Sequence, residues 1–268
     1  MTGEPHTPPE PRTGVPVWVP FVALLAALVL INLFGAVLLG VLGETNPDDL
    51  PDGATIGLTL VQDLIFVYAA WIAVKIALGH ATREDFGLRR VDGWQRALKW
   101  AAIAFALFWA VTIVLALIFG TPKDQQLVTD IKREDTVGVL IAWAVLICVV
   151  APIVEEFFFR GFMFTVFARR LGPVWGALLV GLVFGAGHAP APAISLIALG
   201  AFGVGLCLVY WRTQSIIPCM ALHALNNSIT FGSVKDLDPA LFAGVVVASV
   251  GVVVAAATAV AARPAVSA

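Results

Sequence analysis

Residues 17–42 read VWVPFVALLAALVLINLFGAVLLGVL and carry no charged side chain. A helix needs about 20 apolar residues to cross the roughly 30 Å hydrocarbon core of a bilayer, so this stretch is long enough to span one. The apolar part of a signal peptide is shorter and follows a positively charged segment, which the proline-rich residues before this stretch do not form. We therefore predict a transmembrane helix here rather than a cleaved signal.

Seven further apolar runs follow along the chain, and most are close to the length of a membrane span. Of the 268 residues, 60% are hydrophobic and only 13% are charged, and the mean hydropathy is +0.94. A soluble domain usually has about a quarter charged residues. The sequence thus predicts an all-α fold, a polytopic integral membrane helix bundle with about eight transmembrane helices. The further runs are residues 56–78, 97–119, 136–167, 174–188, 193–211, 215–231 and 240–262.

The loops between these runs differ in charge. The loop after the first run holds four acidic residues and no basic one, whereas the loop at residues 79–96 is rich in arginine. Because basic residues collect on the cytoplasmic side of membrane proteins, we predict that loop 79–96 and both chain termini are cytoplasmic. The net charge of −2 gives no basic surface for nucleic acid, so the lipid bilayer is the partner that the composition predicts.

The chain divides into four predicted segments. Residues 1–16 hold five prolines and are expected to form a disordered tail. Residues 17–134 contain the first three helices, and residues 135–235 contain helices four to seven, which carry the candidate site described below. Residues 236–268 contain the last helix and a short tail.

Small residues at a spacing of four allow transmembrane helices to approach closely. The fifth predicted helix has two such pairs, Gly172 with Gly176 and Gly181 with Gly185, and the sixth has glycines at 200, 203 and 205. We therefore expect these two helices to pack tightly against their neighbours.

Ionisable side chains are costly inside a bilayer and usually mark a functional site there. Lys75 lies near the end of its helix, from which its amine can reach the interface. Asp63 fits a structural hydrogen bond to a neighbouring helix as well as it fits a functional role. The ionisable residues within the predicted helices are Asp63, Lys75, Glu155, Glu156, Arg160, His188 and His223.

Spacing separates Glu155 from Glu156. Adjacent side chains on a helix diverge by about 100°, so the two glutamates face different neighbours. Arg160 follows Glu156 by four residues, which is the spacing of an ion pair along one helix face. This pair would leave Glu155 without a partner. Burial favours the neutral form of an unpaired carboxyl, which suits a general base that works near neutral pH.

The remaining candidates are also spaced by one helical turn. The ring of Phe184 can lie against His188, and His223 shares one helix face with Asn227. These groups could form either a functional site or a polar network that only ties helices together. Because an interhelical hydrogen bond in a membrane often contributes about 1 kcal/mol or less, we favour the functional site.

The three motifs Glu155-Glu156-x-x-x-Arg160, Phe184-x-x-x-His188 and His223-x-x-x-Asn227 occur in this order. Together they resemble the signature motifs of the CPBP family, also called the Abi family. This family comprises CAAX-protease-like and bacteriocin-processing membrane proteases related to the type II CAAX prenyl endopeptidase. Residues 83–88, REDFGL, also resemble a stretch that often precedes the core domain of the family. The resemblance implies that residues 135–235 form a CPBP-like catalytic core.

The resemblance also implies a role for each motif. Glu155, together with His188, would activate a water molecule, and His223 and Asn227 would stabilise the developing oxyanion. The predicted Glu–Arg ion pair would brace the site. The chain would then be an intramembrane endopeptidase that acts on membrane-associated proteins or peptides. The stretch between the two histidines is short, as in bacterial members, which argues for a bacterial plasma-membrane protein and against prenylated substrates.

The residues leave the metal question open. Glu155, His188 and His223 could supply three zinc ligands and leave a fourth position for water. However, a Glu155 that binds metal cannot also act as the free base, and the chain has no His-Glu-x-x-His pair. Family members have been described both as metalloproteases and as glutamic proteases. We favour a mechanism that requires no cofactor.

Two other functions fit the same residues. A transporter also has carboxylates and histidines deep in the membrane, but broken helices in two corresponding halves would be expected. A non-catalytic binding protein, such as a bacteriocin-immunity protein, could keep the same scaffold without hydrolysis. A protease requires Glu155, His188, His223 and Asn227 to converge on one cavity, which gives the prediction that a structure can test.

Overall fold

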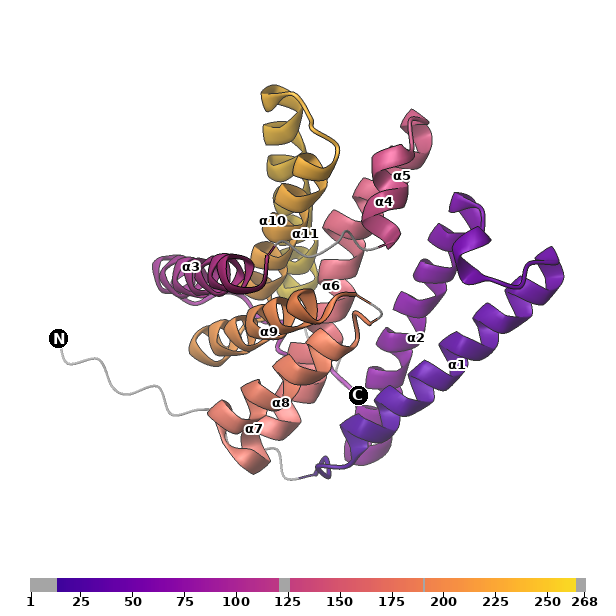
Figure 1. The fold of residues 1–268 in the computed structure, drawn as a ribbon. Helices are drawn as coiled ribbons and strands as arrows, with labels where there is room; N and C mark the ends of the chain where they lie inside the picture. The colour runs from indigo at the N-terminus through magenta and orange to yellow at the C-terminus, as the bar shows by residue number, and fades with distance from the viewer. Residues whose placement is uncertain (1–13, 121–125, 190, 264–268) are drawn as a thin grey trace.

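The computed structural model describes residues 14–120, 126–189 and 191–263 (Figure 1). Nearly all of the predicted disordered tail and the last five residues of the chain lie outside these ranges. Within them every regular element is helical, which confirms the predicted all-α fold. The elements are α1 (Val19–Leu42), η1 (Pro47–Asp49), α2 (Asp52–Leu78), η2 (Arg83–Phe86), α3 (Trp94–Phe119), α4 (Gln126–Arg133), α5 (Val137–Val145), η3 (Leu146–Val150), α6 (Ala151–Glu155), η4 (Glu156–Phe164), α7 (Thr165–Leu171), α8 (Pro173–Ala186), α9 (Ala193–Thr213), α10 (Ile217–Val234) and α11 (Pro239–Ala262).

Six helices in the described residues are long and apolar enough to cross a membrane. They are α1, α2, α3, the continuous helix Val137–Leu171, α9 and α11. The other two predicted spans are weaker, because α8 has only 14 residues and α10 carries the polar side chains of the site. The structure therefore supports a multi-pass helical membrane protein, while the count of eight spans and the orientation stay predictions. The short helix α4 falls where the sequence predicted only a loop.

The helices pack in three groups around the long helix Val137–Leu171 (Figure 1). Helices α1 and α2 form a pair, and α2 packs along the long helix. Helices α8 and α9 pack against each other and against the π-helical segment η4, and α3 covers α9. Helix α10 packs on η3 and α6 and pairs with α11. All three groups thus contact the long helix at or next to α6 and η4.

Glycine allows α8 and α9 to approach at backbone distance, as the sequence predicted. A Cβ atom on Gly181 would lie 2.7 Å from the carbonyl oxygen of Gly200, and one on Gly185 would lie 3.0 Å from the Gly200 nitrogen. Any side chain at these positions would force the two helices apart, because neither backbone can move independently of its helix. This contact sets the distance of α8 from the centre of the bundle.

The long helix contains two π-helical segments, η3 and η4, on either side of α6. Pro152 in the first turn of α6 has no N–H to donate. The preceding turn has the wide π pattern, in which the N–H of Ala151 reaches the carbonyl of Leu146. In the same pattern, the N–H of residue 152 would donate to the carbonyl of Ile147. Because residue 152 is a proline, this carbonyl has no backbone partner. π-Helical turns are common at functional sites, and here they flank Glu155 and Glu156.

A strap formed by η2 and the following loop closes the cytoplasmic side predicted for the bundle. Phe86 is fully buried and stacks on Phe157, with ring centroids 4.1 Å apart. The carbonyl of Phe86 packs directly over Gly161, where a Cβ atom would lie 2.6 Å away. The backbone N–H of Ile216 donates to the Gly87 carbonyl at 3.0 Å. The strap therefore holds η4 and the start of α10 together.

Candidate active site

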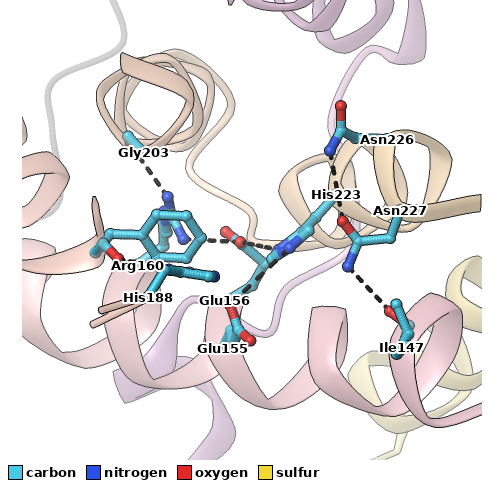
Figure 2. Close-up of polar contacts among 10 residues, drawn as sticks. Ile147, Glu155, Glu156, Arg160, His188, Gly203, His223, Asn226 and Asn227 are labelled. Carbon is cyan, nitrogen blue, oxygen red and sulfur yellow. Dashed lines mark hydrogen bonds and ion pairs between the residues drawn. The ribbon is translucent and has the colours of Figure 1, made fainter. Parts of the chain in front are cut away.

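Three helices bring the predicted site residues together in the interior of the bundle (Figure 2). The segment α6–η4 supplies the two adjacent glutamates and the arginine, α10 supplies a histidine and an asparagine, and the turn directly after α8 supplies the second histidine. The residues labelled are Glu155, Glu156, Arg160, His188, His223, Asn226 and Asn227, together with Ile147 and Gly203.

Glu156 lies at the centre of a buried chain of charged groups. Its Oε1 atom accepts from Arg160 Nη1 at 2.8 Å and from His223 Nδ1 at 2.8 Å (Figure 2). The side chains of Glu156 and Arg160 are both 0% exposed. The predicted ion pair is therefore present, and it has a third member that the sequence did not reveal. Charge-assisted hydrogen bonds of this length are strong and fix side-chain direction.

Arg160 is held by two further contacts. Its Nη2 atom donates to the carbonyl of Gly203 at 3.1 Å, and its guanidinium lies over the ring of Phe184, 4.5 Å from the centroid. An arginine that is shielded from water needs several hydrogen-bond acceptors at fixed positions for its N–H groups. A planar guanidinium can also stack on an aromatic face. The arginine thus connects η4 to both α8 and α9.

His223 stands between the two adjacent glutamates. Because a carboxylate can only accept, the bond to Glu156 puts a proton on Nδ1. The opposite nitrogen, Nε2, faces Glu155 Oε2 at 3.9 Å. This separation exceeds a hydrogen bond, so both atoms can bind a further group between or beside them. The divergence of neighbouring side chains on a helix, predicted from the sequence, is what makes room for the ring.

Glu155 differs from Glu156 in exposure and in partners. Its side chain is 22% exposed, against 0% for Glu156. Its Oε2 atom is buried and has no hydrogen-bond partner among the described residues. A buried carboxylate oxygen without a partner is unusual and commonly marks a site that binds water or a ligand.

His188 is fixed by its own helix. Its Nδ1 atom lies 2.8 Å from the Phe184 carbonyl, which can only accept, so Nδ1 carries a proton and Nε2 is left free. The Phe184 ring lies between the two histidines, with its centroid 5.0 Å from that of His188 and 5.9 Å from that of His223. No hydrogen bond or ion pair joins His188 to Glu155 in the described part of the chain.

Asn227 has a structural partner that the sequence did not predict. Its Nδ2 atom donates to the Ile147 carbonyl at 3.0 Å, which is the carbonyl left unpaired before Pro152 (Figure 2). The Nδ2 atom of the neighbouring Asn226 lies 3.5 Å from Asn227 Oδ1. An amide has two N–H groups, so Asn227 keeps one that could serve a ligand.

The residues do not form a metal site as they stand. In the described ranges no three His, Cys, Asp or Glu side chains lie close enough together to hold one ion. Of the predicted ligands, Glu155 and His223 approach each other, whereas the contacts of His188 are with Phe184. We therefore derive no step through a metal.

The comparison with protein families agrees with the motif reading. Residues 137–229 match the family model described as "Type II CAAX prenyl endopeptidase Rce1-like". This part of the chain is similar to an Rce1-like domain. The match spans all three motifs and η3, α6 and η4, which confirms the resemblance stated from the sequence. The family that this model describes is one of proteases.

Two curated bacterial proteins are similar to a larger part of the chain. The "Uncharacterized protein YyaK" of Bacillus subtilis (strain 168) is 26% identical over 178 residues, 62% of this chain and 58% of that protein. The "Uncharacterized 24.3 kDa protein" of Escherichia coli is 28% identical over 175 residues, 63% of this chain and 74% of that protein. No solved structure gives a significant match. The chain thus spans little more than half the length of the Bacillus relative.

Proposed function

We propose that the chain is an intramembrane endopeptidase that hydrolyses peptide bonds of membrane-associated proteins or peptides. The observation that carries the proposal is the approach of Glu155 and His223 to 3.9 Å from two helices, inside an apolar bundle. A carboxylate beside an imidazole ring can bind a water molecule and take its proton. The Rce1-like match over the same residues supports an endopeptidase.

In the proposed reaction, the water oxygen attacks the carbonyl carbon of the scissile bond while Glu155 takes a proton from the water. The oxygen of the tetrahedral intermediate then carries the negative charge. When the C–N bond breaks, the amine nitrogen takes the proton back from Glu155. The free Nε2 atom of His188 is a second acceptor that could orient the water. The products are an amine and a carboxylic acid, which then releases its proton to water.

The oxyanion is proposed to be stabilised by His223 and Asn227. For His223 to donate from Nε2, the ring must carry both protons, with Nδ1 still donating to the Glu156 carboxylate at 2.8 Å. The free N–H of Asn227 would be the second donor. Donors fixed in advance at such a position are worth far more in a water-poor site than in bulk water.

The substrate is proposed to be a membrane-embedded or membrane-bound segment, because the candidate residues lie on helices within the bundle. We keep the prediction that the substrate need not be prenylated. The two bacterial relatives support the proposed location in a bacterial plasma membrane.

The test is hydrolysis of a membrane-peptide library by the purified protein in lipid vesicles. Glu155→Gln keeps the size and hydrogen bonding of the side chain but removes the base, so the rate should fall by about 10²- to 10⁴-fold while peptide binding is retained. The matched control is Asp49→Asn, which neutralises an exposed carboxyl in η1 and should leave the rate unchanged. If the wild type and Glu155→Gln both bind peptide and neither hydrolyses it, the result would instead favour a non-catalytic membrane partner such as an immunity protein.

A further inference from the structure

One buried ionisable group is not used by the proposed reaction. Asp63 lies in the middle of α2 and is only 4% exposed. Its Oδ2 atom is buried and has no hydrogen-bond partner among the described residues. A carboxyl that is simply structural inside a membrane protein would be expected to have its polar atoms paired with a neighbouring helix.

Two contacts determine what Asp63 faces. Near the start of α2, Trp143 Nε1 donates to Asp52 Oδ1 at 3.2 Å. Further along, the rings of Phe66 and Phe158 pack with centroids 4.8 Å apart. Helix α2 and the long helix Val137–Leu171 therefore run in the same direction. The difference in residue number between the two paired residues changes by only one from the first contact to the second.

This register brings Asp63 opposite Glu155. Asp63 precedes Phe66 by three residues, and Glu155 precedes Phe158 by three, so each carboxyl lies one turn before a phenylalanine of the packed pair. Helix α1, which packs on the other side of α2, contains no ionisable residue.

Two carboxyls that face each other in an apolar interior are not both ionised, so the pair holds a proton. Glu155 is the more exposed of the two and has the His223 ring beside it, whereas Asp63 is only 4% exposed. The ionised form therefore falls to Glu155 and the proton to Asp63. A protonated carboxyl is a hydrogen-bond donor, and the unpaired Oε2 atom of Glu155 is an acceptor.

We propose that Asp63 is a positioning residue for Glu155: it stays protonated and, through one water molecule, donates a hydrogen bond that orients the Glu155 carboxylate. This inference rests on the proposed hydrolysis, in which Glu155 takes and returns the proton of the attacking water. Asp63 keeps its own proton throughout. The long helix and α2 thus both contribute to the site, although the three motifs lie outside α2.

The first arm of the test measures hydrolysis by full-length variants in vesicles. Asp63→Asn keeps a donor of the same size, so kcat should stay close to wild type. Asp63→Leu removes the donor, and kcat should fall about 10- to 100-fold with KM unchanged, as expected when a reacting group is misoriented. Thr112→Val is the control, because Thr112 bonds only within its own helix α3, to the Phe108 carbonyl. Equal kcat for Asp63→Leu and wild type would overturn the proposal.

The second arm does not depend on activity. Infrared spectra of the full-length protein in vesicles should contain the C=O band of a protonated carboxyl that disappears in Asp63→Asn and shifts in Glu155→Gln. A structural role for Asp63 alone would leave that band unchanged in Glu155→Gln, and this result would overturn the inference. If instead the wild type cleaves no peptide while the band behaves as expected, the proposed function fails and the Asp63–Glu155 contact stands.

Discussion

Glu156→Gln should be among the most destabilising single substitutions in this protein. Glu156 bonds Arg160 and His223 through one oxygen, both at 2.8 Å, and neither Glu156 nor Arg160 is exposed to solvent. The variant leaves the arginine charge buried without its counter-ion. Breaking one partner of a buried ion pair costs about 3–5 kcal/mol, and the contacts of Arg160 with Gly203 and Phe184 offset only part of that loss.

Glu155→Gln is the matched comparison for this prediction. The two glutamates are adjacent, but Glu155 is 22% exposed and its Oε2 atom has no hydrogen-bond partner among the described residues. We expect Glu155→Gln to change the free energy of unfolding by about 1 kcal/mol or less. Glu156→Gln should shift the unfolding equilibrium by roughly 10²- to 10⁴-fold.

The assay is unfolding by SDS in mixed micelles, followed by the fluorescence of the eight tryptophans. The double variant Glu156→Gln/Arg160→Met removes both charges and should be more stable than Glu156→Gln alone, because no unpaired charge remains. Equal unfolding midpoints for Glu156→Gln and Glu155→Gln, or strictly additive losses in the double variant, would refute the reasoning.

Three further predictions follow from the packing and the site. Gly185→Ala should lower stability by about 1–3 kcal/mol through overpacking of α8 against α9, whereas Gly244→Ala, whose new methyl group would meet no atom within 4 Å, should have little effect in the same unfolding assay. Phe86→Ala should cost about 3–5 kcal/mol by emptying the buried contact of the strap, and Phe119→Ala, at a position that is 64% exposed, serves as its control. Peptide hydrolysis should persist in the presence of strong chelators, and stoichiometric zinc lost in step with activity would contradict the metal-free mechanism.

Much of the fold and part of the site could be predicted from the sequence. An apolar run that is long enough, as a helix, to cross the bilayer has few alternatives to a transmembrane helix. The reason is that the backbone must satisfy its hydrogen bonds within each span. The Glu156–Arg160 pair is local to one helix turn, so spacing alone predicted it. The close approach of α8 and α9 followed from glycine spacing for the same reason.

The contacts between distant parts of the chain required the tertiary structure. His223 bonds Glu156 and faces Glu155 only because α10 packs on α6, and the π-helical turn before Pro152 directs Asn227 to the Ile147 carbonyl instead of leaving both its N–H groups free. The register between α2 and the long helix, which brings Asp63 opposite Glu155, is set by the Phe66–Phe158 contact. A sequence pattern specifies which face of a helix is polar, whereas the partner of that face depends on helix crossings and registers that side-chain packing determines.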